Sequence, residues 1–188
     1  APSDKKVTSK INYYYNTPSY YAGTYLRYYL DRSIDDNSSI LQQLPQVQAH
    51  KYIDSAFYDN LLYSFDVKNT NYTRENGLNA NLTDVNVPVS LSFSFFDDFL
   101  NLTLSEELVL SKINYSNSST KYENAYLGQS LHVLDLSTDL IKPYSSFIHT
   151  LNLSSKFTFA DTLKESGDIY GLNGDFQDNS DLSPFSLS

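Results

Sequence analysis

Seven asparagines stand in the triplet Asn-X-Ser/Thr, in which the asparagine amide can accept an N-linked sugar. They are Asn37, Asn71, Asn81, Asn101, Asn114, Asn117 and Asn152. N-linked sugar is added outside the cytosol, so the triplets predict an exported, sugar-coated protein. An Asn- and Ser-rich chain yields about three to four such triplets by chance, and accidental triplets remain the alternative. The absence of cysteine from the chain excludes disulfides, thiol catalysis and thiolate metal sites.

Other residues able to do chemistry are scattered. His50, His132 and His149 have no metal-ligand spacing, and His132 and His149 fall in strand-like runs where a neighbouring side chain satisfies the ring. The doublets Asp97-Asp98 and Glu106-Glu107 cannot converge on one bond, because neighbours in a strand point to opposite faces. We interpret them as turn residues and solvated charge. The chain has neither a nucleophile elbow nor a phosphate loop, so we expect no enzymatic activity.

The stretch from Asp168 to Asp181 is rich in side-chain oxygens and contains Gly171 and Gly174. It lacks the ordered ligand spacing and the closing glutamate of an EF-hand. An acidic tail is therefore the favoured interpretation, with a calcium site as the alternative. We expect no metal and no cofactor apart from covalent N-linked glycans.

Charge narrows the classes of partner. The formal net charge is −9, which argues against nucleic acid and against an anionic membrane surface as partners.

No run of about 18 apolar residues is present, so the sequence predicts no membrane span. The opening Ala1-Pro2-Ser3 is typical of a chain from which a signal peptide has been removed.

The elements that must position these residues are strands. Apolar residues occupy odd positions from Val85 to Phe95, the turn Asp97-Asp98 follows, and leucines resume at Leu100 on the other parity. This pattern predicts a β-hairpin over 85–104 with one apolar and one polar face. Pro88 cannot donate a ladder hydrogen bond, which predicts that its strand lies at a sheet edge.

Further alternating runs predict strands over 7–15, 24–30, 107–115, 121–128, 130–136 and 147–159. Residues 50–63 favour a short helix, with strand as the alternative. Many short strands and little helix predict an all-β fold, a β-sandwich of the jelly-roll or immunoglobulin-like kind. Residues 1–20 form an N-terminal arm and residues 21–188 a head domain in this interpretation. The 17 tyrosines suit sugar stacking, subunit packing or an ordinary core.

This cysteine-free, Tyr/Asn/Ser-rich, triplet-dense, all-β chain resembles the glycosylated thread-type filament subunits on the surface of thermoacidophilic archaea. The resemblance implies an N-terminal donor strand that inserts into the next subunit by main-chain pairing. The matching segment is 5–16, and its inserted face comprises Val7, Ser9, Ile11, Tyr13 and Tyr15. A terminal strand that pairs within its own sheet is the alternative.

These observations together predict the structural subunit of an extracellular, N-glycosylated filament or pilus at the cell surface. Its partners would be identical subunits joined head to tail in an open-ended homopolymer. The alternative is a monomeric secreted or surface-layer module with adhesive or carbohydrate-binding activity.

Overall fold

The computed structural model describes residues 5–116 and 122–169. They form eight antiparallel strands in a single sheet, and the all-β prediction is confirmed. The strands are β1 (Lys6–Asn16), β2 (Tyr20–Asp31), β3 (Gln42–Ser55), β4 (Leu61–Thr73), β5 (Asn79–Phe95), β6 (Leu100–Ser116), β7 (Ala125–Pro143) and β8 (Ile148–Ser166). No helix in this described part of the chain is long and apolar enough to cross a membrane.

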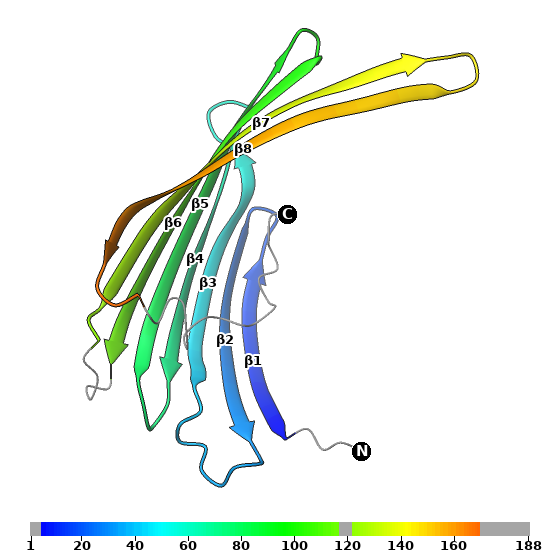
Figure 1. The fold of residues 1–188 in the computed structure, drawn as a ribbon. Helices are drawn as coiled ribbons and strands as arrows, with labels where there is room; N and C mark the ends of the chain where they lie inside the picture. Colours follow the sequence, from blue (N-terminus) through cyan, green and yellow to red (C-terminus); the bar gives the residue numbers. More distant parts are fainter. Residues whose placement is uncertain (1–4, 117–121, 170–188) are drawn as a thin grey trace.

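The strand order follows the chain from β1 to β8 (Figure 1). The sequence left open a choice between jelly-roll and immunoglobulin-like strand orders. The described strands have neither order. Each strand lies beside the strand that precedes it in the chain and runs antiparallel to it, so the sheet is a simple meander. The sheet is strongly curved, and the β5–β6 and β7–β8 hairpins project beyond the ends of β1 to β4.

The predicted hairpin over 85–104 is confirmed by β5 and β6, which pair from Asn79↔Ser116 to Phe95↔Leu100. The prediction that Pro88 marks a sheet edge is wrong, since β5 lies between β4 and β6. Between Tyr63↔Val89 and Asp66↔Asn86 the β4–β5 ladder has no paired residues. An interior strand therefore accommodates the missing N–H of this proline at a local break in the ladder.

The helix predicted over 50–63 is also wrong, and the strand alternative holds. His50 and Lys51 lie in β3, opposite Asp66 and Phe65 of β4. The turn between these two strands spans 56–60. Pairing with strands on both sides outweighs the weak helical preference of the segment.

The β5–β6 pair has two faces of opposite character. One face, which we call the polar face, carries five side-chain hydrogen bonds across the pair, 2.6–3.1 Å long. The bonded pairs are Asp84–Ser111, Asn86–Glu107, Ser90–Ser105, Ser92–Thr103 and Ser94–Asn101. The other, the apolar face, carries the valines, leucines and phenylalanines of the alternating pattern, from Val85↔Leu110 to Phe95↔Leu100. This division follows from the period-two geometry of a strand.

The buried core lies on the same side of the sheet as the polar face, at the end of β5 and β6 near the β4–β5 turn. Ile113 has 0% of its surface exposed and pairs with Leu82 and Ala125. Tyr72 pairs with Ala80 in the same cluster. Burial of these side chains anchors one end of the sheet, whereas many large apolar side chains elsewhere remain exposed.

Candidate functional site

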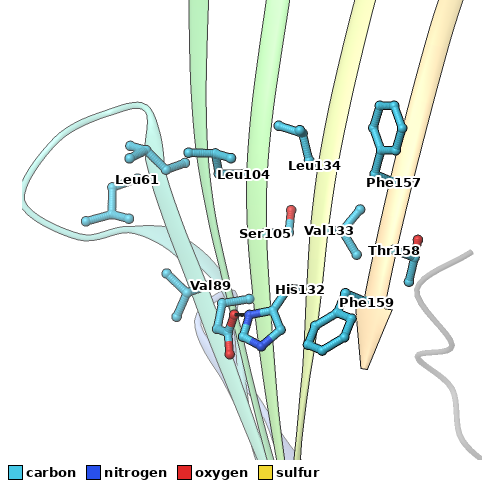
Figure 2. A pocket seen from close by; sticks show the side chains of 12 residues that line it. Leu61, Val89, Leu104, Ser105, His132, Val133, Leu134, Phe157, Thr158 and Phe159 are labelled. Carbon is cyan, nitrogen blue, oxygen red and sulfur yellow. Dashed lines mark ion pairs between the residues drawn. The ribbon is translucent and has the colours of Figure 1, made fainter. Parts of the chain in front are cut away.

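The apolar face is hollowed midway along the long strands, over β4 to β8 (Figure 2). The hollow has a volume of about 520 Å³, within the range of small-molecule sites. Its lining comes from five consecutive strands, so the cross-strand register sets which side chains meet there.

Two rows of side chains on the apolar face line the hollow, and the residues between these rows, Ser105, Val133 and Thr158, complete the lining. The first row crosses the sheet through Leu61, Leu91, Leu104, Leu134 and Phe157, and every member is apolar. The next row crosses through Val89, Glu106, His132 and Phe159. Figure 2 shows His132 between Val89 and Phe159, the two apolar ends of this second row, and the register places Glu106 beside His132 on β6. The site is thus an apolar surface with one polar centre.

The polar centre is an ordered chain of three side chains. Oε2 of Glu106 contacts Nδ1 of His132, and Nε2 of His132 is hydrogen-bonded to Oγ of Ser130 at 3.0 Å. The His132 ring also stacks on Phe159, with 5.8 Å between ring centroids. Ser130 is buried, whereas the Glu106 and His132 side chains are 47% and 46% exposed. The imidazole is therefore fixed on both nitrogens, and the carboxylate remains accessible from the hollow.

The sequence interpretation missed this site. It treated Glu106 as solvated charge and His132 as a strand histidine satisfied by a neighbour. The description of His132 is accurate for the contacts of its ring. It did not recognise that the ring lies on an apolar surface. The signal was available, because Glu106 interrupts a parity run that is otherwise leucine, from Leu100 to Leu110. A charged residue in an apolar register is the pattern that could have identified the site.

The predicted glycan acceptors are spread over the sheet and are not brought together. Asn71 of β4 is half-buried and donates to the Leu44 carbonyl at 2.6 Å. Asn152 of β8 is exposed and donates to Oδ1 of Asp139. The other described acceptors lie in the β2–β3 connection, β5 and β6: Asn37, Asn81, Asn101 and Asn114. Asn117 lies outside the described residues, and glycosylation stays a prediction at all seven positions.

The calcium alternative falls largely outside the structure, since every candidate ligand from Asn173 onward lies beyond the described residues. Asp168 itself is committed to local contacts. Its carboxylate accepts the Glu123 N–H at 2.7 Å, and its carbonyl accepts the Tyr115 hydroxyl at 2.5 Å.

The proposed linking strand, with Val7, Ser9, Ile11, Tyr13 and Tyr15, lies within β1. This strand pairs with β2 of its own chain from Lys6↔Asp31 to Asn16↔Tyr21. Most of its side chains are exposed, including Tyr13 at 78%. One edge of β1 is thus occupied inside the chain by its sequence neighbour, as the alternative in the sequence interpretation held.

Comparison with known proteins identifies the family. The profile of the LptD family, described as LPS transport system D, matches residues 3–183. The chain therefore belongs to the LptD family, which places it in the cell envelope. No curated protein matches the chain.

This membership corrects the functional interpretation. The prediction of a filament subunit that polymerises by donor-strand insertion is wrong, and so is the prediction of identical subunits as partners. The adhesive or carbohydrate-binding alternative is set aside for the same reason. Sequence composition misled here because exposed polar strands with surface asparagines serve several kinds of envelope protein alike.

Proposed function

We propose that this protein acts in the transport of LPS to the cell surface, in the outer membrane and together with other components of the transport system. Membership of the LptD family over residues 3–183 carries the proposal. The two-faced β5–β6 sheet supports it in physical terms. LPS is amphipathic, and a protein that handles it must offer both hydrocarbon and hydrophilic surfaces.

The two faces have distinct roles in this proposal. The apolar face, which includes Leu91 and Leu102, lies against acyl chains and so removes its exposed hydrocarbon from water. The polar face, including Ser92 and Thr103, borders a hydrated region where its hydroxyl groups exchange hydrogen bonds with water or sugar. The five side-chain hydrogen bonds of that face hold β5 and β6 in register.

Depletion of the protein in its host tests the function. Newly made LPS should accumulate inside the cell, while LPS that an antibody reaches on intact cells falls. Re-expression of the wild-type chain should restore surface LPS. Normal surface labelling after depletion would refute a role in LPS transport.

A matched pair of substitutions tests the assignment of the faces. Leu102→Asp places a charge on the apolar face, where desolvation in lipid is costly, and should sharply lower the amount of protein assembled in the envelope. Ser92→Asp places the same charge on the exposed part of the polar face, where the carboxylate can still accept from the Thr103 hydroxyl, and should leave assembly near the wild-type level. Equal effects of both variants would contradict the assignment.

A further inference from the structure

We propose that the hollow at Glu106 and His132 is a binding site for one acyl chain of a glycolipid, a chain that carries a hydroxyl or amide N–H group near its polar end. This inference rests on the proposed function and specifies where the protein holds part of its cargo. The hydrocarbon occupies the two apolar rows, and the donor group reaches the Glu106 carboxylate.

The first step of the argument concerns hydrocarbon. The all-apolar row from Leu61 to Phe157 offers a continuous surface across five strands. Phe157 and Leu104 are 59% and 43% exposed, so a chain laid over them removes their surface from water. Burial of each methylene contributes about 0.8 kcal/mol in general. A wholly hydrophilic ligand would gain nothing from this row.

The second step concerns the polar centre. A bare hydrocarbon over Glu106 and His132 would strip water from the ion pair and return no hydrogen bond. Both imidazole nitrogens are already engaged, by Glu106 and by Ser130. The Glu106 carboxylate has two oxygens, and Oε2 is the oxygen that pairs with the imidazole. Oε1 is therefore the acceptor that the hollow offers to a ligand.

The third step selects the ligand chemistry. A carboxylate accepts hydrogen bonds and does not donate them, so the matching ligand group is an O–H or N–H. An acyl chain with a hydroxyl group or an amide linkage supplies that donor. A simple ester-linked phospholipid chain supplies only acceptors along the chain and at its linkage. The hollow should therefore favour an acyl chain that carries such a donor over an ester-linked chain of the same length.

Native mass spectrometry of the purified chain in detergent tests the site. The two probes are lipid A with hydroxylated, amide-linked chains and phosphatidylcholine, whose ester-linked chains and quaternary ammonium carry no O–H or N–H donor. We expect a one-to-one adduct with lipid A at concentrations where phosphatidylcholine gives little. Equal adducts with both lipids would overturn the proposal, because they would indicate non-selective coating of an apolar surface.

Two matched pairs of variants localise the adduct. Leu134→Trp fills the hollow and should abolish lipid A binding, whereas Leu136→Trp lies one row away on the same strand and should preserve it. Glu106→Gln replaces one carboxylate oxygen with a donor and should weaken lipid A binding by about tenfold or more. Glu107→Gln, on the opposite face, should leave binding unchanged.

The outcome of either pair decides the proposal. Equal binding by the two tryptophan variants, or by the two glutamine variants, would overturn it. If Leu134→Trp fails to fold by circular dichroism, the glutamine pair decides alone. The proposed function is judged separately by depletion. If depletion blocks LPS transport but no selective adduct forms, only the proposed lipid-binding site is overturned. If a selective adduct forms but depletion causes no transport defect, only the transport role is overturned.

Discussion

Arg27 of β2 donates from Nη1 to Oε1 of Gln43 of β3 at 2.8 Å, and both side chains are buried inside the sheet. The bond lies where the β2–β3 register shifts, between Tyr25↔Gln46 and Arg27↔Gln43. A bulge leaves local backbone unpaired, so side-chain bonds at such a point help to fix the register. Arg27 and Gln43 are therefore structural residues of the sheet.

The Arg27–Gln43 bond gives the first prediction. Arg27→Met keeps most of the side-chain volume but removes the donor to a buried amide oxygen. The free energy of unfolding should fall by about 1–3 kcal/mol, measured by urea denaturation. Arg32→Met, at an exposed position, is the control and should change stability by less than about 0.5 kcal/mol. A similar loss in both variants would show that the buried bond has no special role.

The buried end of the sheet gives the second prediction. Ile113 has no exposed surface and packs in the cluster with Leu82 and Ala125. Ile113→Ala should cost about 2–5 kcal/mol, because it removes buried methylenes and leaves a cavity. Ile141, which is 66% exposed on the β7–β8 hairpin, is the matched control. If Ile141→Ala lowers the melting temperature in detergent as much as Ile113→Ala does, the assignment of the buried core to the cluster around Ile113 is wrong.

Glycine at the end of β8 gives the third prediction. Gly167 has φ +72°, and an added Cβ would fall on the carbonyl oxygen of Asn124. Gly167→Ala should therefore destabilise the protein by about 1–3 kcal/mol or more. At Gly128 the nearest atom to an added Cβ would be the flexible Leu110 Cδ2, at 3.3 Å. Gly128→Ala should be better tolerated in the same thermal melt, and the reverse order would contradict the geometry.

Local alternation was sufficient to predict much of the fold. The parity of the valines from Val85 to Val89, and of the leucines from Leu100, identified β5, β6 and the turn between them, because side chains in a strand point alternately to the two faces. The same reasoning identified β1 and β2. It treated 121–128 and 130–136 as separate strands, whereas β7 runs from Ala125 to Pro143.

Strand order and the site depend on pairing, which is not a local property. The residues around Pro88 in the sequence give no sign that the β4–β5 ladder is interrupted next to this proline. Likewise Glu106 and His132 are 26 positions apart in the chain and meet only through the β6–β7 register. The sequence could reveal that Glu106 interrupts an apolar register, but the structure was needed to identify its partner.

The β5–β6 turn gives the fourth prediction. Phe96, Asp97 and Asp98 all have positive φ, at 57°, 54° and 65°. Such a conformation is unfavourable for residues with a Cβ, and glycine adopts it without that cost. Asp98→Gly should raise the free energy of unfolding by about 0.5–1 kcal/mol. Asp59→Gly, in the 56–60 turn where φ is not positive, should lower it instead, and an increase in both variants would argue against strain at Asp98.

The β2–β3 connection gives the last prediction, a dependence on pH. The backbone N–H and then the hydroxyl of Ser38 donate to the Asp36 carboxylate and hold its pKa below the usual range. Because the folded pKa is lowered, the stabilisation is complete above the ordinary aspartate pKa of about 3.9 and is lost as the pH falls through the folded value.

Ser38→Ala removes the hydroxyl donor but keeps the N–H, so the pKa of Asp36 should rise part of the way toward its ordinary value. Ser39→Ala, one position further along the chain, is the control and should leave the pKa of Asp36 unchanged. Titration of the Asp36 carboxyl carbon by NMR between about pH 2 and 6 measures both. The same midpoint in Ser38→Ala and wild type would show that the hydroxyl does not lower the pKa of Asp36, and the backbone N–H of Ser38 would then account for the lowering.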